Sequence, residues 1–301
     1  MYQENKNMLV IIKSITLFVL FTLLIGCAIE NKKDDSKTIS TTTTINVNTA
    51  TTPGVLKLLP IGTIGADQTR GYAEYVPPDY KSQTNWPCII FLHGDGELAD
   101  GKTVAVLQSF TYSCLPGMIY NNTWDDKHRF VVLAPQFASY ADRSAINVNN
   151  FIQYVKKYYN IDTKRIYLSA VSGGGVALGN YLDTYSGGEA AAVLPVSCYV
   201  PSNAKKWASV PVWFFCGEAD TTVNPNPNII NNYKALMTGS PSVLPKVTLY
   251  IGVGHDGNSV NKTYAPKLND NTFAATLTDG TTSITLVSYS NIYDWLLQYH
   301  R

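Results

Sequence analysis

Short apolar runs alternate with segments of helical periodicity over most of this 301-residue chain. Between residues 148 and 159, for example, apolar side chains recur at helical spacing, with a continuous apolar run on either side of them. Strands that are apolar on both faces belong in a sheet that is covered on both sides. The repeated order of strand, helix and strand therefore predicts an α/β domain with a mostly parallel, doubly wound sheet and helices on both faces. The predicted strands are residues 71–76, 88–92, 130–134, 165–170, 190–196, 211–215 and 246–251. Helices are predicted over 148–159 and 292–300 and from 173 onward, and 228–237 is predicted to be a helical or loop segment.

Ligands of such sheets bind beyond the carboxyl ends of the strands, so residues that directly follow a predicted strand are the candidates for chemistry. Ser172 is one of them, because it follows the strand 165–170 within the sequence AVSGG. A serine at the tip of a sharp turn between a strand and a helix is a nucleophile elbow, and this strained turn requires small neighbours. Ala170 stands where the usual G-x-S-x-G motif has its first glycine. Taken alone, the segment fits a non-catalytic glycine-rich turn equally well.

An acid and a histidine follow two later strands. Asp220 comes after the strand 211–215 within CGEAD, and His255 comes after the strand 246–251 within GVGHD. The order serine, acid, histidine is that of the α/β-hydrolase triad. The other three histidines do not fit this order, because His93 and His128 precede the serine and His300 lies beside the C-terminus. A lone loop histidine is usually a solvated or capping side chain, but three motifs in order favour a triad of Ser172, Asp220 and His255.

A glycine-rich loop, His93-Gly94-Asp95-Gly96-Glu97, follows the predicted strand 88–92. Backbone N–H groups in a loop at this place can bind a developing oxyanion, together with the N–H of the residue after the nucleophile. We therefore predict that the N–H groups of Asp95 and Gly173 form an oxyanion hole. The alternative is a plain turn between a strand and a helix.

Six segments in order, YVPPDY, IIFLHGDGE, IYLSAVSGGG, CGEADTTV, GVGHD and IYDWLLQ, resemble the dienelactone-hydrolase and prolyl-oligopeptidase-like branch of the α/β-hydrolases, especially its secreted esterases and predicted peptidases. The resemblance covers about residues 72–301. It implies an α/β-hydrolase fold in which Ser172 is the nucleophile, Asp220 the acid and His255 the base. Glu218 and Asp256 are rival acids, but neither stands at the matching position. The chain departs from the pattern by extra sequence over about 271–290.

The resemblance implies a serine hydrolase that cleaves carboxylic esters, including acyl or feruloyl groups on glycans, through an acyl-enzyme. Such a mechanism requires no metal and no cofactor. Two alternatives stay open. One is a serine peptidase or a polyester hydrolase, and the other is a non-catalytic lipoprotein that binds a ligand on a hydrolase fold.

The N-terminus has the pattern of a bacterial lipoprotein signal. Lys6 and Lys13 precede an apolar run over 15–25, which is too short to span a bilayer, and the run ends in Leu-Ile-Gly-Cys at Cys27. We therefore predict a signal peptide over 1–26, a lipidated Cys27 that begins a flexible tether over 27–53, and a catalytic domain over 54–301. The alternative is that the apolar run is an N-terminal membrane anchor and that Cys27 follows it by chance.

These features predict a protein of the bacterial cell envelope, lipid-anchored outside the cytoplasm at the outer membrane or the cell surface. The expected partners are an ester substrate, either a small molecule or a glycan, and the membrane through the lipid. A net charge of +1 from only 15% charged residues gives no basic face for nucleic acid.

Cysteine usage and one turn signal complete the predictions. Besides Cys27 the chain has four cysteines, an even number that allows disulfides, but apolar surroundings favour buried free thiols. These are Cys88, Cys114, Cys198 and Cys216.

The sequence over 272–288 predicts a β-hairpin, because two β-prone runs flank Asp279-Gly280, a dipeptide suited to a tight turn. Its place after the histidine loop suggests a position near the active-site mouth.

Overall fold

The computed structural model describes residues 53–82, 84–112, 114–124, 129–200, 203–255, 263–265, 276–285 and 291–301. All of these residues belong to one compact unit, Thr44–Arg301. The predicted signal peptide, Cys27 and nearly all of the tether lie outside the described residues. Within the described ranges, no helix is long and apolar enough to cross a membrane.

An eight-stranded sheet forms the centre of this unit, in the order β1-β2-β4-β3-β5-β6-β7-β8. Strands β3 to β8 are parallel, whereas β2 runs antiparallel to both of its neighbours. The prediction of a mostly parallel sheet is confirmed, and the short edge strand β1 is an addition to it. The strands are β1 Lys57–Leu59, β2 Tyr72–Tyr75, β3 Trp86–Leu92, β4 Val131–Pro135, β5 Ile161–Val171, β6 Ala192–Val196, β7 Trp213–Gly217 and β8 Lys246–Tyr250.

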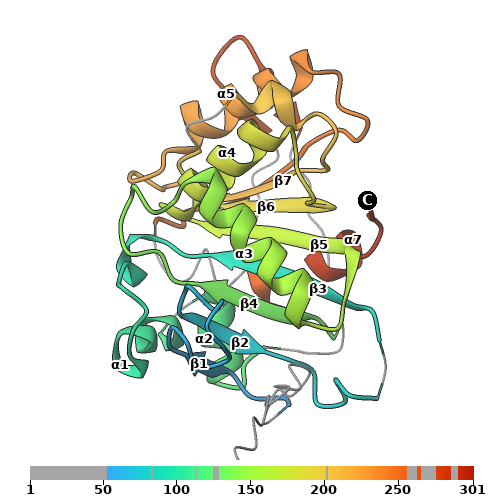
Figure 1. The fold of residues 1–301 in the computed structure, drawn as a ribbon. Coiled ribbons are helices and arrows are strands. Elements are labelled where there is room, and N and C mark those ends of the chain that lie inside the picture. Colours follow the sequence, from blue (N-terminus) through green and yellow to red (C-terminus); the bar gives the residue numbers. More distant parts are fainter. Residues whose placement is uncertain are drawn as a thin grey trace, which may run out of the picture. The chain divides into compact units, whose positions relative to one another are not determined.

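Helices cover both faces of the sheet, as the apolar strands predict. Alternate residues of β3 enter two different cores: Ile90 belongs to the core that includes residues of α3, α4 and α5, whereas Phe91 belongs to the core that includes residues of α2 and α7. Figure 1 shows α3 lying across the central strands. Each such buried apolar side chain contributes about 1.5–3 kcal/mol relative to an exposed one. The helices are α1 Val104–Leu107, α2 Cys114–Tyr120, α3 Ala145–Tyr158, α4 Gly174–Tyr185, α5 Pro225–Thr238 and α7 Ile292–Leu296, with short 3-10 turns at Asp95–Glu97, Gln108–Thr111 and Ala204–Trp207.

The predicted hairpin is present in the described residues 276–285, with a longer turn than the sequence suggests. Strands β9 (Thr276–Thr278) and β10 (Ser283–Thr285) pair antiparallel and leave a four-residue loop rather than a two-residue turn. The Asp279 carboxylate accepts hydrogen bonds from the N–H groups of Thr281 and Thr282, which favours this wider loop. The hairpin lies against α5, where Asn226 donates to the carbonyl of Thr278. Its predicted position near the active-site mouth stays a prediction.

The four cysteines of the described domain are free and buried, which confirms the preferred prediction. Burial raises the pKa of the Cys88 and Cys198 thiols well above the ordinary value. Neutral thiols of this kind behave as small hydrophobic side chains.

Candidate active site

Ser172 lies directly after β5 in a strained turn. Its φ of +51° falls in the left-handed region, which is uncommon for a residue other than glycine and typical of a nucleophile elbow. The glycines that follow are required by close packing. A Cβ on Gly174 would lie 2.2 Å from the carbonyl oxygen of Leu92, and one on Gly175 would lie 2.4 Å from that of Tyr199. The sequence motif and the backbone therefore agree that this turn presents the serine hydroxyl at the carboxyl edge of the sheet.

The structure brings the three predicted triad residues together from the ends of β5, β7 and β8. The Oγ of Ser172 lies 2.9 Å from Nε2 of His255, and Nδ1 of His255 lies 2.8 Å from Oδ2 of Asp220. The Asp220 side chain is fully buried, and its Oδ1 accepts hydrogen bonds from the N–H groups of Thr222 and Val223. Where the Nδ1–H donates to Asp220, Nε2 is left as an acceptor for the Ser172 hydroxyl, an arrangement that can take up a serine proton.

Glu218, one of the rival acids, is held elsewhere. Its Oε2 accepts a hydrogen bond of 3.1 Å from the N–H of Gly252, while Asp220 occupies the position beside the imidazole. Asp256, the other rival, lies outside the described residues.

The glycine-rich loop after β3 lies against the nucleophile turn. A Cβ on Gly94 would lie 3.3 Å from Cβ of Ser172, and one on Gly173 would lie 1.9 Å from Oδ1 of Asp95. Neither the Asp95 N–H nor the Gly173 N–H donates a hydrogen bond to another described residue. The two predicted oxyanion-hole residues are thus neighbours, and their roles stay a prediction.

Arg143 holds this loop in place, a function that the sequence did not suggest. Its side chain is fully buried, and its guanidinium donates to Oδ1 of Asp95 at 2.6 Å and to the carbonyls of Gly94 and His93 at 2.7 and 3.2 Å. The Arg143 carbonyl in turn accepts a hydrogen bond from Asn180 of α4, the helix that begins two residues after Ser172. We call Arg143 and its bonds to the loop the arginine clamp.

Tyr140 completes the clamp. Its hydroxyl donates to the second carboxylate oxygen of Asp95, and its ring lies under the Arg143 guanidinium at 4.8 Å. Partial burial raises the pKa of Asp95, but the hydrogen bonds from Tyr140 and Arg143 outweigh this effect and lower it overall. The Asp95 side chain is therefore an anion that is fixed beside Gly173. The one sequence signal for Arg143 was its place in the segment after β4, at the same edge of the sheet.

His93 supports the same loop as a buried neutral residue. Its Nδ1 donates to the carbonyl of Gly94 at 2.6 Å, and its Nε2 accepts the N–H of Phe137 at 2.8 Å. Burial lowers the pKa of His93 to about 3, so the imidazole stays uncharged in both bonds. Both ring nitrogens of His93 are thus used to hold this part of the chain.

Comparison with known proteins supports the fold. No protein-family model matches the sequence, and no curated protein matches it. Among solved structures, a thermostable esterase is similar with a TM-score of 0.52 and 22% identity, over 77% of this chain and 59% of that chain. A truncated carbohydrate esterase from gut microbiota is similar with a TM-score of 0.50 and 14% identity, over 72% of this chain and 94% of that one. The domain has an α/β-hydrolase fold.

Proposed function

We propose that the protein is a serine hydrolase that cleaves carboxylic esters. The observation that carries this proposal is the hydrogen-bonded series from Ser172 through His255 to the buried Asp220, with the serine in a left-handed turn. The esterases among the similar folds support the choice of an ester, and the matched glycan esterase makes glycan-bound acyl groups the first substrates to test.

In the proposed reaction, His255 removes the proton of Ser172 while the serine oxygen attacks the ester carbonyl. The N–H groups of Asp95 and Gly173 stabilise the tetrahedral oxyanion. His255 then protonates the leaving alcohol, and the acyl-enzyme remains. Water, activated by the same histidine, attacks the acyl carbon and releases the carboxylic acid and the free serine.

A substrate panel tests this proposal. We expect hydrolysis of p-nitrophenyl acetate and release of acetate or ferulate from esterified glycans, with no release from peptide p-nitroanilides. Peptide cleavage without ester cleavage would instead identify a peptidase, and no turnover of any substrate would favour a non-catalytic ligand-binding protein.

Replacing Asp220 with asparagine is expected to lower kcat by about 10⁴. The amide can hold the histidine only in the wrong tautomer, with the proton on Nε2, where it cannot accept the serine proton. Steady-state kinetics on p-nitrophenyl acetate measure the effect, and Glu218→Gln is the matched control because that carboxylate binds Gly252 instead. A larger loss of kcat in Glu218→Gln than in Asp220→Asn would contradict the proposal that Asp220 is the acid of the triad.

Removing the arginine clamp with Arg143→Met is expected to lower kcat by about 10², with little change in KM. The loop that carries the Asp95 N–H would lose its bonds to the guanidinium, so the oxyanion donor would be displaced. Arg165→Met is the control, because it removes an ion pair with Asp162 at the start of β5. Because a buried arginine can be needed for folding, Tyr140→Phe serves as a milder variant at an exposed residue. Parental kcat in both folded variants would contradict the clamp.

We further propose that the mature protein is anchored outside the cytoplasm by a lipid on Cys27, because a short apolar run ends there and a polar segment follows. Cys27→Ser is expected to leave the protein unprocessed or soluble, since the thiol carries the lipid. Mass spectrometry of the native protein measures the modification, and Cys114→Ser, a buried cysteine of the domain, should leave it unchanged. An unmodified Cys27 in the native protein would contradict the anchor.

A further inference from the structure

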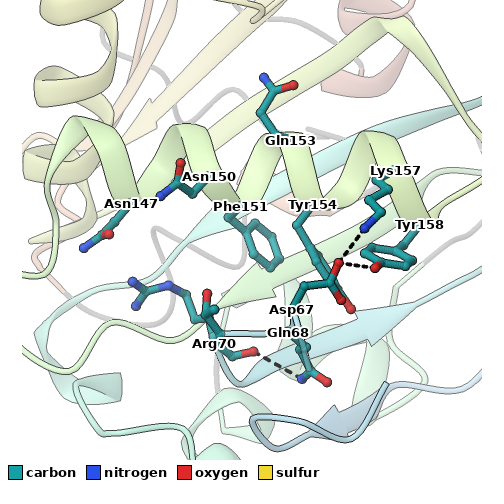
Figure 2. A pocket seen from close by; sticks show the side chains of 11 residues that line it. Asp67, Gln68, Arg70, Asn147, Asn150, Phe151, Gln153, Tyr154, Lys157 and Tyr158 are labelled. Atoms are coloured by element: carbon teal, nitrogen blue, oxygen red, sulfur yellow. Dashed lines mark hydrogen bonds and ion pairs between the residues drawn. The ribbon is translucent and has the colours of Figure 1, made fainter. Parts of the chain in front are cut away.

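A cavity of about 340 Å³ lies between α3 and the segment 67–70, and none of the three triad residues lines it (Figure 2). Its α3 side carries the amides Asn147, Asn150 and Gln153, the aromatic residues Phe151, Tyr154 and Tyr158, and Lys157. Residues with these spacings share one face of a helix. The cavity is therefore bordered by a stripe of amide and aromatic side chains, and its volume falls at the lower end of the range for small-ligand sites.

Aromatic side chains contribute to the lining of this cavity, with Phe151 largely buried and Tyr154 and Tyr158 partly exposed. The rings of Phe151 and Tyr154 are nearly parallel at 24°, with centroids 6.1 Å apart, and the Tyr154 and Tyr158 centroids are 4.7 Å apart. Such rings bury a large area at low conformational cost.

The opposite wall is fixed by its own hydrogen bonds. The buried Gln68 side chain donates to the carbonyls of Leu59, Pro60 and Arg70, and it accepts the N–H of Ile64. The segment 67–70 is thus held before any ligand arrives, which reduces the entropy lost on binding.

Charged groups at the cavity are already paired. Arg70 forms a bidentate pair with Asp142, with distances of 2.5 and 2.9 Å. Lys157 lies 2.6 Å from Asp67, and Figure 2 shows this pair. A phosphate or an amine would have to break one of these pairs, so the cavity favours an uncharged ligand.

Neutral polar groups, by contrast, remain available. The Asn150 side chain and the Thr69 hydroxyl make no hydrogen bond with any other described residue, although both line the cavity. Asn147 uses its amide N–H groups to bind Asp142, while its amide oxygen makes no such bond within the same ranges. A purely apolar ligand would leave these donors and acceptors unsatisfied, whereas hydroxyl groups match both kinds.

We propose that this cavity binds a sugar residue of a neutral glycan. A sugar ring combines an apolar face, which suits the aromatic side chains, with hydroxyl groups, which suit Asn147, Asn150 and Thr69. The ligand is expected to be neutral because every charged side chain that lines the cavity is already in an ion pair. It is expected to carry hydroxyl groups because the neutral polar groups of Asn147, Asn150 and Thr69 can still form hydrogen bonds.

One segment borders both the cavity and the candidate active site. Asp142 holds Arg70 and Asn147 at the cavity, while the next residue, Arg143, holds Asp95 beside the nucleophile turn. A glycan chain bound in the cavity would raise the effective concentration of its own ester groups at Ser172. This last step rests on the proposed function, whereas sugar binding itself does not.

Isothermal titration with unesterified cellohexaose, xylohexaose, mannohexaose and maltohexaose tests the proposal without any turnover. We expect at least one of them to bind saturably at one site per chain, and Asn150→Ala/Thr69→Val to weaken that binding by about tenfold or more. Asn149→Ala, on the same helix but outside the cavity lining, should bind like the parent protein. Chain treated with a fluorophosphonate should also bind unchanged, because the cavity is separate from Ser172.

Hydrolysis of p-nitrophenyl acetate by the double variant should stay at the parental rate, which separates a failure of sugar binding from a failure of the proposed function. The proposal is overturned if none of the four neutral hexasaccharides binds at millimolar concentration, or if only an anionic oligogalacturonate binds. It is equally overturned if the double variant binds as tightly as the parent.

Discussion

Ser172→Ala is expected to reduce kcat for p-nitrophenyl acetate by about 10⁶ while leaving the fold intact. The serine oxygen forms the bond to the acyl carbon, and no other group at the elbow can replace it. In the structure its hydroxyl is bonded to His255, so alanine removes that bond and little packing. Stopped-flow and steady-state kinetics measure the loss, and thermal unfolding checks the fold.

Ser186→Ala is a matched control for this variant. Ser186 also has a left-handed backbone, with a φ of +49°, but it lies at the opposite end of α4. Its replacement should leave kcat unchanged. A folded Ser172→Ala protein that hydrolyses the ester at the parental rate would show that Ser172 is not the nucleophile.

His255→Ala is expected to cost a similar factor, about 10⁶, and the double variant Ser172→Ala/His255→Ala should lose hardly more than either single variant. The serine is a weak nucleophile without its base, and the base has no function without the serine, so the two losses do not add. The same assay measures all three variants. The exposed His300→Ala is the control, and independent, additive losses would show that the two residues do not act as one unit.

The arrangement of the sheet and the meeting of Ser172, Asp220 and His255 at its edge could be predicted because both depend on local sequence. Continuous apolar runs such as 88–92 mark strands that are covered on both faces, and a glycine-rich segment after a strand marks a sharp turn. Ser172, Asp220 and His255 each follow such a run, and parallel strands bring their carboxyl ends to one edge.

Features that depend on contacts between distant segments could not be predicted. Strand β1 is three residues long and has no pattern of its own, and the direction of β2 is set by its pairing with β4. The arginine clamp joins residues 48 positions apart, and either residue alone reads as an ordinary surface charge. The same holds for the cavity, because its two walls come from separate segments of the chain.

Boundaries of elements differ for local physical reasons. The predicted helix over 292–300 begins as expected, where the Asn291 side chain accepts the N–H of Tyr293, but it ends at Leu296. After it the chain turns, and the N–H of Arg301 donates to the carbonyl of Lys164. The hairpin loop is longer than the predicted two-residue turn. The Asp279 carboxylate accepts hydrogen bonds from the N–H groups of Thr281 and Thr282, and this arrangement competes with a two-residue turn.

Labelling with a fluorophosphonate tests the central claim most directly, because the reagent reacts only with an activated serine and needs no knowledge of the natural substrate. Intact mass and peptide mapping should show one adduct per chain, located on Ser172, that is absent in Ser172→Ala and retained in Ser186→Ala. A folded protein that takes up no reagent, or that takes it up at another serine, would contradict the assignment of Ser172 as the nucleophile.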